Sequence, residues 1–220
     1  MVLLVMLAKR IIETNEGMQD ETIVELFTSY AKFMRDEGWY EIDLMVETGI
    51  SSGDILEIGP GPGLVGLEIV KKLPDSKLTG CEISQAMIQA AEMNAAEYRI
   101  SAKYIHGNAI KMPFEDSSFD SVITNASMHE WEDPILVFNE IYRVLRDGGH
   151  YCITDLRRDV DRSKWDYVYY STPKKLRPSL LASLNASYTK DEILEILSKS
   201  DLKNASVKYS LFTLCVYGNK

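Results

Sequence analysis

The feature that most constrains the fold is a regular alternation of strand-like and helix-like segments between residues 55 and 155. Short apolar runs alternate there with longer segments whose apolar residues recur every three or four positions. The strand-like runs cover 55–59, 77–83, 103–106, 119–124 and 150–155, and the helix-like segments cover 64–73, 84–98 and 133–145. This alternation predicts a parallel sheet with helices on both faces.

The ends of the chain differ from this central pattern. Helical periodicity runs from about residue 20 to 48, and a further helix is expected over 190–200. Two β-rich runs follow at 205–209 and 211–217, and strands with so short a connection must pair antiparallel. We therefore expect an α/β fold with a doubly wound, seven-stranded sheet that is mostly parallel and has an antiparallel C-terminal strand.

Composition excludes several classes of function. The chain has 24 basic and 33 acidic residues and a net charge of -9, which repels phosphate backbones, so we expect no DNA partner. Cys81, Cys152 and Cys215 lie far apart, and three reduced, buried thiols would suit the cytoplasm. The apolar run at residues 1–8 is too short to cross a bilayer and lacks the features of a secretory signal, so no membrane association is expected.

The loop after the first strand carries the chemistry. Glycines alternate with prolines over residues 59–63, and alternate glycines allow a ligand to approach bare backbone. The two prolines remove backbone donors that a pyrophosphate would use. Glu57, just before the loop, would repel a pyrophosphate and suits a cationic ligand. The same region also matches the dinucleotide fingerprint, which is weak evidence alone, so an NAD(P)-dependent oxidoreductase stays an alternative.

Glu82 ends the second strand of the predicted sheet. A carboxylate at this position can accept hydrogen bonds from both hydroxyls of a ribose. Together with the preceding glycine loop, it indicates a nucleoside-containing ligand.

Four motifs in order, ILEIGPGPG, TGCEIS, HGNAIKMPFEDSSFDSVITN and EIYRVLRDGG, resemble those of class I S-adenosylmethionine-dependent methyltransferases. They are most similar to the small-molecule subgroup that includes ubiquinone and menaquinone C-methyltransferases. The resemblance covers about residues 54–155 and implies a Rossmann-like fold, with S-adenosyl-L-methionine as cofactor and S-adenosyl-L-homocysteine as product. The cofactor-binding residues that it implies are Glu57, Gly59, Gly61, Gly63, Glu82, Ile83, Met87, Gly107, Asn108, Ala109 and Asn125, with Tyr30 as a further candidate that is equally suited to the core.

One position departs from the family pattern. The family usually has Asp where this chain has Asn108. The amide oxygen of asparagine can still accept a hydrogen bond from the adenine amino group, with less charge.

Methyl transfer from a sulfonium is an in-line displacement that depends on alignment and on exclusion of water. A base is required only where the nucleophile carries a proton. His129 is the candidate for that catalytic role, and a packing or helix-capping role is the alternative. No His, Asp and Cys set has metal-ligand spacing, so no metal is expected.

The segment that follows the central region is expected to select the acceptor. Residues 157–177 hold seven basic and three acidic residues together with aromatic side chains. We interpret this segment either as a solvated surface helix or as a lid over an anionic or aromatic small-molecule acceptor, contacted by Arg157, Arg158 and Trp131.

These expectations define one methyltransferase domain over residues 1–220. It would comprise an N-terminal helical segment (1–50), the cofactor-binding core (54–155), a variable lid (156–189) and a C-terminal helix and β-hairpin (190–220). A module that binds S-adenosylmethionine without turnover is a further alternative, and the sequence leaves the oligomeric state open.

Overall fold

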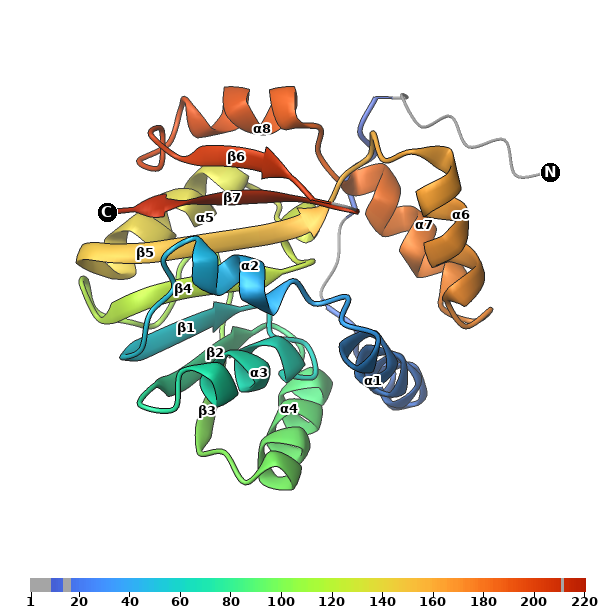
Figure 1. Cartoon of the computed structure of the whole chain (residues 1–220), viewed down its shortest axis with the longest axis horizontal. Helices are drawn as coiled ribbons and strands as arrows, with labels where there is room; N and C mark the ends of the chain where they lie inside the picture. The colour runs from blue at the N-terminus through green and yellow to red at the C-terminus, as the bar shows by residue number, and fades with distance from the viewer. Residues whose placement is uncertain (1–8, 14–16, 211) are drawn as a thin grey trace.

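The computed structural model describes residues 9–13, 17–210 and 212–220, so the apolar run at 1–8 lies outside the described residues. Its centre is a seven-stranded sheet in the order β3-β2-β1-β4-β5-β7-β6 (Figure 1). All neighbouring pairs from β3 to β5 are parallel, and β7 is antiparallel to both of its neighbours. The strands are β1 (Asp54–Ile58), β2 (Lys77–Glu82), β3 (Ala102–His106), β4 (Phe119–Asn125), β5 (Leu145–Leu156), β6 (Ser206–Tyr209) and β7 (Thr213–Asn219).

Helices cover both faces of this sheet. One face packs against α2 (Ile42–Glu47), α3 (Leu64–Lys72) and α4 (Gln85–Tyr98), and the other against α5 (Pro134–Val144) and α8 (Lys190–Leu197). The predicted α/β fold, including its antiparallel C-terminal strand, is therefore confirmed.

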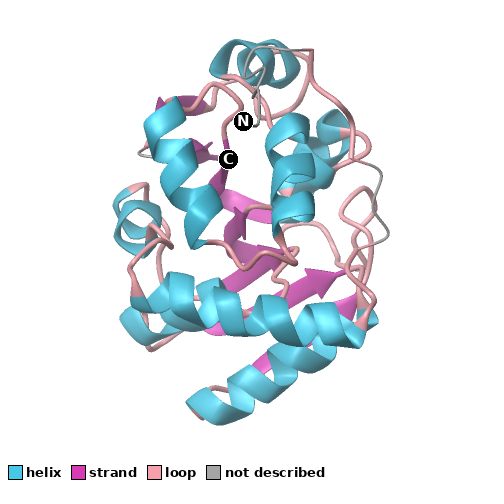
Figure 2. Ribbon diagram, turned by 90° about the vertical axis from the view of Figure 1, so that its right-hand side faces the viewer, coloured by secondary structure: helices cyan, strands magenta, loops and turns pink. Residues whose placement is uncertain are grey.

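Three further helices lie beyond the carboxyl ends of the parallel strands. They are α1 (Glu21–Asp36), α6 (Arg162–Ser171) and α7 (Arg177–Ala186), and they stand apart from the sheet on one side of the molecule (Figure 1). Figure 2 views the molecule from that side, with the strand ends visible between the helices. Ligands of open α/β sheets bind at this edge.

Two boundaries differ from the sequence-based expectation. The helical periodicity over 20–48 corresponds to two helices, because Gly38 follows α1 in a left-handed conformation with φ of 72°. The helix expected over 133–145 ends at Val144, and β5 begins at Leu145 and continues through the glycine pair. Gly148, with φ of 78°, allows the chain to turn without ending the strand.

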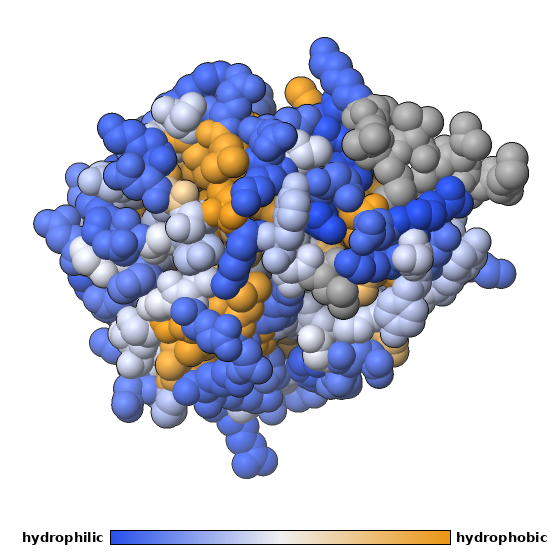
Figure 3. All heavy atoms as spheres, turned by 45° about the horizontal axis from the view of Figure 1, so that its top comes forward, coloured by the Kyte–Doolittle hydropathy of each residue, from blue (hydrophilic) through white to orange (hydrophobic). Residues whose placement is uncertain are grey.

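The surface on the side of α8 and β6 is largely hydrophilic, with separate hydrophobic areas between the charged groups (Figure 3). Within the part of the chain that the structure describes, no helix combines the length and the apolar character needed to cross a membrane.

The contact between β1 and α3 is unusually close. A Cβ atom on Gly66 would lie 2.3 Å from Glu57 Oε2 and 2.8 Å from Leu78 Cδ2. Only glycine lets the first turn of α3 approach the sheet this closely, and this approach places the preceding glycine loop.

We expect Gly66→Ala to destabilise the protein by about 1–3 kcal/mol, because overpacking costs this much in a dense core. Gly→Ala within a helix otherwise stabilises by roughly 1 kcal/mol. Urea unfolding would measure the change, and Ala96→Gly, on the exposed side of α4, would give the helix-propensity contribution alone. A Gly66→Ala variant more stable than the wild type would contradict this account of the contact.

Candidate active site

The glycine loop between β1 and α3 is open on one side. Gly59, Gly61 and Gly63 have φ of 59°, 52° and 76°, in the left-handed region that favours glycine. A Cβ atom on Gly61 would meet a single neighbour within 4 Å, Phe27 Cε1 of α1 at 3.9 Å. The loop therefore presents bare backbone toward α1.

Glu57 lies beneath this loop. Its side chain is buried, and its Oε1 accepts a hydrogen bond of 3.1 Å from the Gly66 backbone N–H. Its Oε2 is buried and has no hydrogen-bond partner. Burial raises the pKa of Glu57 to about 8, the Gly66 hydrogen bond lowers it, and the nearby Glu82 carboxylate raises it. The structure thus places Glu57 under the loop, where its Oε1 supports the backbone and a bound cation would favour the ionised form of its carboxyl group.

Glu82 ends β2 beside the same loop. Its Oε2 accepts a hydrogen bond of 3.0 Å from the Gly61 N–H, and its Oε1 accepts one of 2.9 Å from the Ser84 N–H. Burial raises the pKa of Glu82, while these backbone donors lower it. The expected ribose-binding carboxylate is therefore fixed in place by the backbone at the end of β2.

A stretch of the N-terminal segment lies over the next positions. Ser84 caps α4 and also donates a hydrogen bond to the Met18 carbonyl oxygen. A Cβ atom on Gly17 would lie 2.9 Å from Ile83 Cγ2. Ile83 is half-buried and Met87 is buried, as suits residues expected to flank an adenine ring.

The third expected contact group follows β3. Asn108 Oδ1 accepts a hydrogen bond of 2.9 Å from the Ile110 N–H, so this side chain shapes its own loop. The second lone pair of that oxygen is still able to accept a further hydrogen bond. The Gly107 N–H donates to the Glu82 carbonyl oxygen at 2.9 Å, which joins this loop, with Ala109, to the end of β2.

Asn125 is the last residue of β4, and its Oδ1 accepts a hydrogen bond of 2.9 Å from Thr154 Oγ1 of β5. Ala126 then adopts φ of 53°. The chain turns sharply there into the short 3-10 helix η1 (Met128–Glu130), which carries His129.

His129 is buried and pairs with a residue of the neighbouring strand. Its Nδ1 lies 2.8 Å from Asp155 Oδ1, and its backbone N–H donates to Asp155 Oδ2 at 2.7 Å. Burial lowers the pKa of His129, but Asp155, Glu130 and Glu13 raise it, and the result is about 9. Asp155 thus holds the imidazole ring in place, and the role of His129 as a general base stays a prediction.

Tyr30 and Trp131 have structural contacts. Tyr30 of α1 is buried, and its hydroxyl lies 2.8 Å from Thr172 Oγ1 after α6. Trp131 packs edge-on against Phe138 within the core under α5. Tyr30 thus ties α1 to α6, and the core position of Trp131 does not support the expected contact with an acceptor.

Arg157 and Arg158 are also engaged within the protein. Arg158 is 5% exposed, binds the Ser187 carbonyl oxygen and pairs with Glu192 Oε1 at 2.6 Å. Arg157 is 9% exposed and stacks over the Tyr209 ring at 4.2 Å. These contacts do not support the expectation that the two arginines bind an anionic acceptor, because both face protein partners.

Two acidic residues at this edge were missed by the sequence reasoning. Asp155 was detectable, since it lies one residue beyond the Asn125–Thr154 register pair, at the edge where parallel strands end. Glu13 was not, because no local pattern indicates that residue 13 reaches residue 129.

The residues at this edge fit the cofactor that the motifs imply. The open backbone at Gly61 can accommodate a closely approaching ligand, and Glu57 Oε2, which has no hydrogen-bond partner among the described residues, leaves a carboxyl oxygen under the loop. Buried carboxylates stabilise a cationic ligand and disfavour a pyrophosphate. Glu57, Glu82 and the glycine loop therefore suit a cationic nucleoside.

Comparison with known proteins agrees with this geometry. A family model described as "Methyltransferase domain" matches residues 56–153. Demethylmenaquinone methyltransferase of Roseiflexus castenholzii is 30% identical over 123 residues, which cover 56% of this chain and 51% of that protein. The chain spans between 51% and 64% of the length of the first curated relatives that it matches.

Solved structures share the fold. A SAM-dependent methyltransferase from Aquifex aeolicus superimposes with a TM-score of 0.66 at 16% identity, over 91% of this chain and 98% of that one. Geranyl diphosphate C-methyltransferase from Streptomyces coelicolor, solved with S-adenosyl-L-homocysteine, gives a TM-score of 0.61 at 15% identity, over 81% and 74%. The match of residues 56–153 to the methyltransferase domain and the shared fold together support a class I methyltransferase with S-adenosyl-L-methionine as cofactor.

Proposed function

We propose that this protein transfers the methyl group of S-adenosyl-L-methionine to a small acceptor with an apolar, aromatic ring. The observation that carries the proposed methyl transfer is the open glycine loop between two buried carboxylates, Glu57 and Glu82, at the edge where β1 and β2 end. The bound cofactor supplies a methyl group on a positively charged sulfur, which is already activated for displacement. The protein must bind and align the reactants and exclude water.

A groove beside α1 supports the proposed class of acceptor. One part, of about 260 Å³, is lined by Leu26, Ser29, Tyr30, Phe33, Ser171 and Pro173. An adjoining part of about 440 Å³ includes Lys174 and Lys175. Phe27, on the same helix, faces Gly61, so α1 connects the groove with the glycine loop. The name of the Roseiflexus relative indicates a quinone-type ring as the first acceptor to test.

The residues of the site perform the non-covalent part of this reaction. Glu82 holds the ribose end against the glycine loop, and Glu57 lies beneath the loop, where a cationic ligand favours the ionised form of its carboxyl group. Beside the groove, Tyr30 stacks on Phe33 and Trp39 packs edge-on against both rings, and this aromatic cluster limits the access of water. The proton of a phenol-type acceptor would leave to solvent or buffer.

We expect micromolar binding of S-adenosyl-L-methionine and S-adenosyl-L-homocysteine in isothermal titration, and no binding of NADH, because Pro60 and Pro62 remove backbone N–H donors that a pyrophosphate would use. Glu82→Gln should weaken both ligands at least tenfold, about 1.4 kcal/mol. Glu92→Gln, on the exposed side of α4, serves as the matched control. Binding of NADH alone would replace this proposal with the oxidoreductase alternative.

The burial of the Glu57 carboxyl group predicts that the stability of the protein depends on pH. In the folded protein Glu57 keeps its proton up to a pKa of about 8, whereas in the unfolded chain it loses the proton near pH 4.5. As the pH rises between these two values, the contribution of Glu57 to the stability of the fold therefore falls. The unfolding free energy of the wild type, relative to Glu57→Gln, should fall by at most about 1.4 kcal/mol per pH unit. Denaturant titrations from pH 5 to 8 measure it, and a pH-independent difference would contradict the buried position.

The proposed acceptor groove can be tested by filling it with a large side chain. Ser29→Trp places a large ring in the groove at an exposed position, so the fold should persist. With a soluble naphthoquinol as acceptor, we expect KM to rise at least tenfold while cofactor affinity is unchanged. Ser163→Trp, exposed on α6, is the control. An unchanged KM in the Ser29→Trp variant would show that the acceptor does not bind in this groove. Absence of turnover with any acceptor would favour a module that binds S-adenosyl-L-methionine without turnover.

A further inference from the structure

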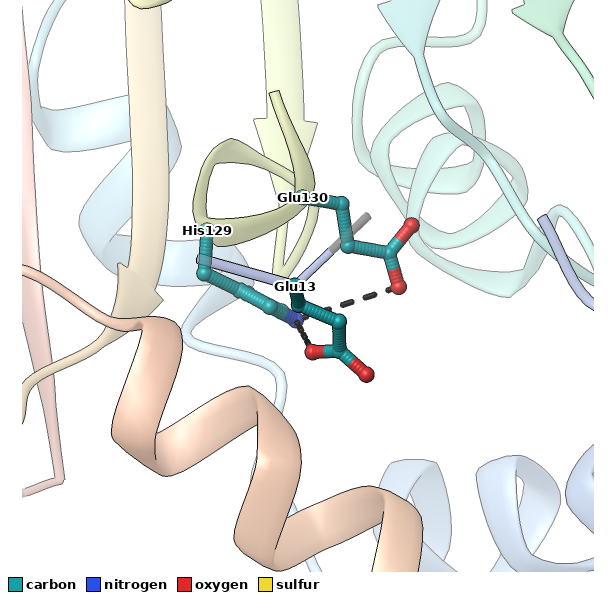
Figure 4. A group of neighbouring side chains, drawn as sticks. All are labelled: Glu13, His129 and Glu130. Carbon is teal, nitrogen blue, oxygen red and sulfur yellow. Dashed lines mark ion pairs between the residues drawn. The ribbon is translucent and has the colours of Figure 1, made fainter. Parts of the chain in front are cut away.

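Three potential metal ligands converge at the end of β4. His129 and Glu130 lie on η1, and Glu13 reaches them from the N-terminal segment (Figure 4). His129 Nε2 is 4.0 Å from Glu13 Oε2 and 3.9 Å from Glu130 Oε1. One ligand atom from each of the three residues lies within 4.8 Å of the other two.

The imidazole is oriented as in a metal ligand. Metal-binding histidines commonly donate their other ring N–H to a carboxylate, which fixes the ring and leaves the second nitrogen for the metal. Asp155 occupies that position, 2.8 Å from His129 Nδ1. His129 is 3% exposed, and its Nε2 is aimed between Glu13 and Glu130.

The surrounding charge is strongly negative. Glu13, Glu130 and Asp155 face one imidazole, and Glu13 Oε2 is a buried atom that has no hydrogen-bond partner in the described part of the chain. Arg10 is close, but its guanidinium donates to the carbonyl oxygens of His129 and Ala186. A single proton on the imidazole therefore balances part of this charge, and a divalent cation would balance it more completely.

We propose that His129 Nε2, Glu13 and Glu130 bind a divalent transition-metal ion of the zinc or manganese class, with Asp155 orienting the imidazole. One nitrogen and two carboxylate ligands suit these ions better than calcium or magnesium. Zinc–ligand bonds of about 2.0–2.2 Å place two tetrahedral ligands roughly 3.4 Å apart. The observed 3.9 and 4.0 Å thus require carboxylate movements of about half an ångström.

The proposed metal site differs from the expectation of no metal, which was based on residue spacing. Two of the ligands are adjacent in sequence and the third is more than a hundred residues away, which matches no spaced motif. It also goes beyond the proposed methyl transfer, because the ion would join the N-terminal segment to the edge of the sheet whether or not an acceptor is bound.

Metal-free protein, prepared by dialysis against EDTA, tests the site. Titration with ZnCl₂, MnCl₂ and MgCl₂ should show one high-affinity site for zinc or manganese and much weaker binding of magnesium. CoCl₂ should give visible d–d absorption bands that report imidazole coordination. Glu13→Gln and His129→Gln should each lower the affinity at least tenfold, and Asp155→Asn should lower it roughly 10–100-fold.

Glu132→Gln, an exposed neighbour of the site, is the matched control and should bind metal as the wild type does. Circular dichroism verifies that each variant is folded, and Glu13 lies on an N-terminal segment where loss of its charge should leave the sheet intact. Equal metal affinity in the wild type and the folded Glu13→Gln variant would overturn the proposal, as would absence of binding by wild type. Titration of each variant with S-adenosyl-L-methionine separates this result from a failure of the proposed function.

Discussion

The burial of two carboxylates at the ends of adjacent strands is the constraint on which the rest of the site depends. Removing Glu57 and Glu82 from water costs free energy that the backbone N–H groups of Gly61, Gly66 and Ser84 partly offset. Those donors are available because the chain turns through glycines and α3 approaches β1 without an intervening side chain. The same contacts that hold the carboxylates therefore also shape the loop.

The central sheet and the glycine loop could be predicted because their signals are local. Apolar periodicity and glycine spacing are properties of consecutive residues, so β1, α3 and the position of Glu82 followed from short windows of sequence. The pairing of His129 with Asp155 and Glu13 depends on residues that become neighbours when the strands assemble. The break between α1 and α2 was missed because amphipathic periodicity continues across Gly38.

The basic segment after β5 shows how composition can mislead. Its excess of positive charge predicted contact with an acceptor, yet several of these cations have partners within the protein: Arg158 pairs with Glu192, Arg157 with Asp159, and Lys164 with Asp161. Arg177 lies over the rings of Tyr169 and Tyr170. These contacts fasten α6 and α7 to each other and to the C-terminal elements, and Lys174 and Lys175 remain beside the groove.

The contacts of the N-terminal segment bear on how fast a ligand can be released from the edge of the sheet. Ile11 donates a backbone hydrogen bond to Asn185, Arg10 holds the carbonyls of Ala186 and His129, and Met18 accepts from Ser84. These few contacts can open with far less free energy than global unfolding. The contact between Met18 and Ser84 lies at the end of β2, so a nucleoside bound there under the proposed function would leave more readily once this contact opens. Its residence time would then reflect the strength of these backbone contacts as much as its own affinity.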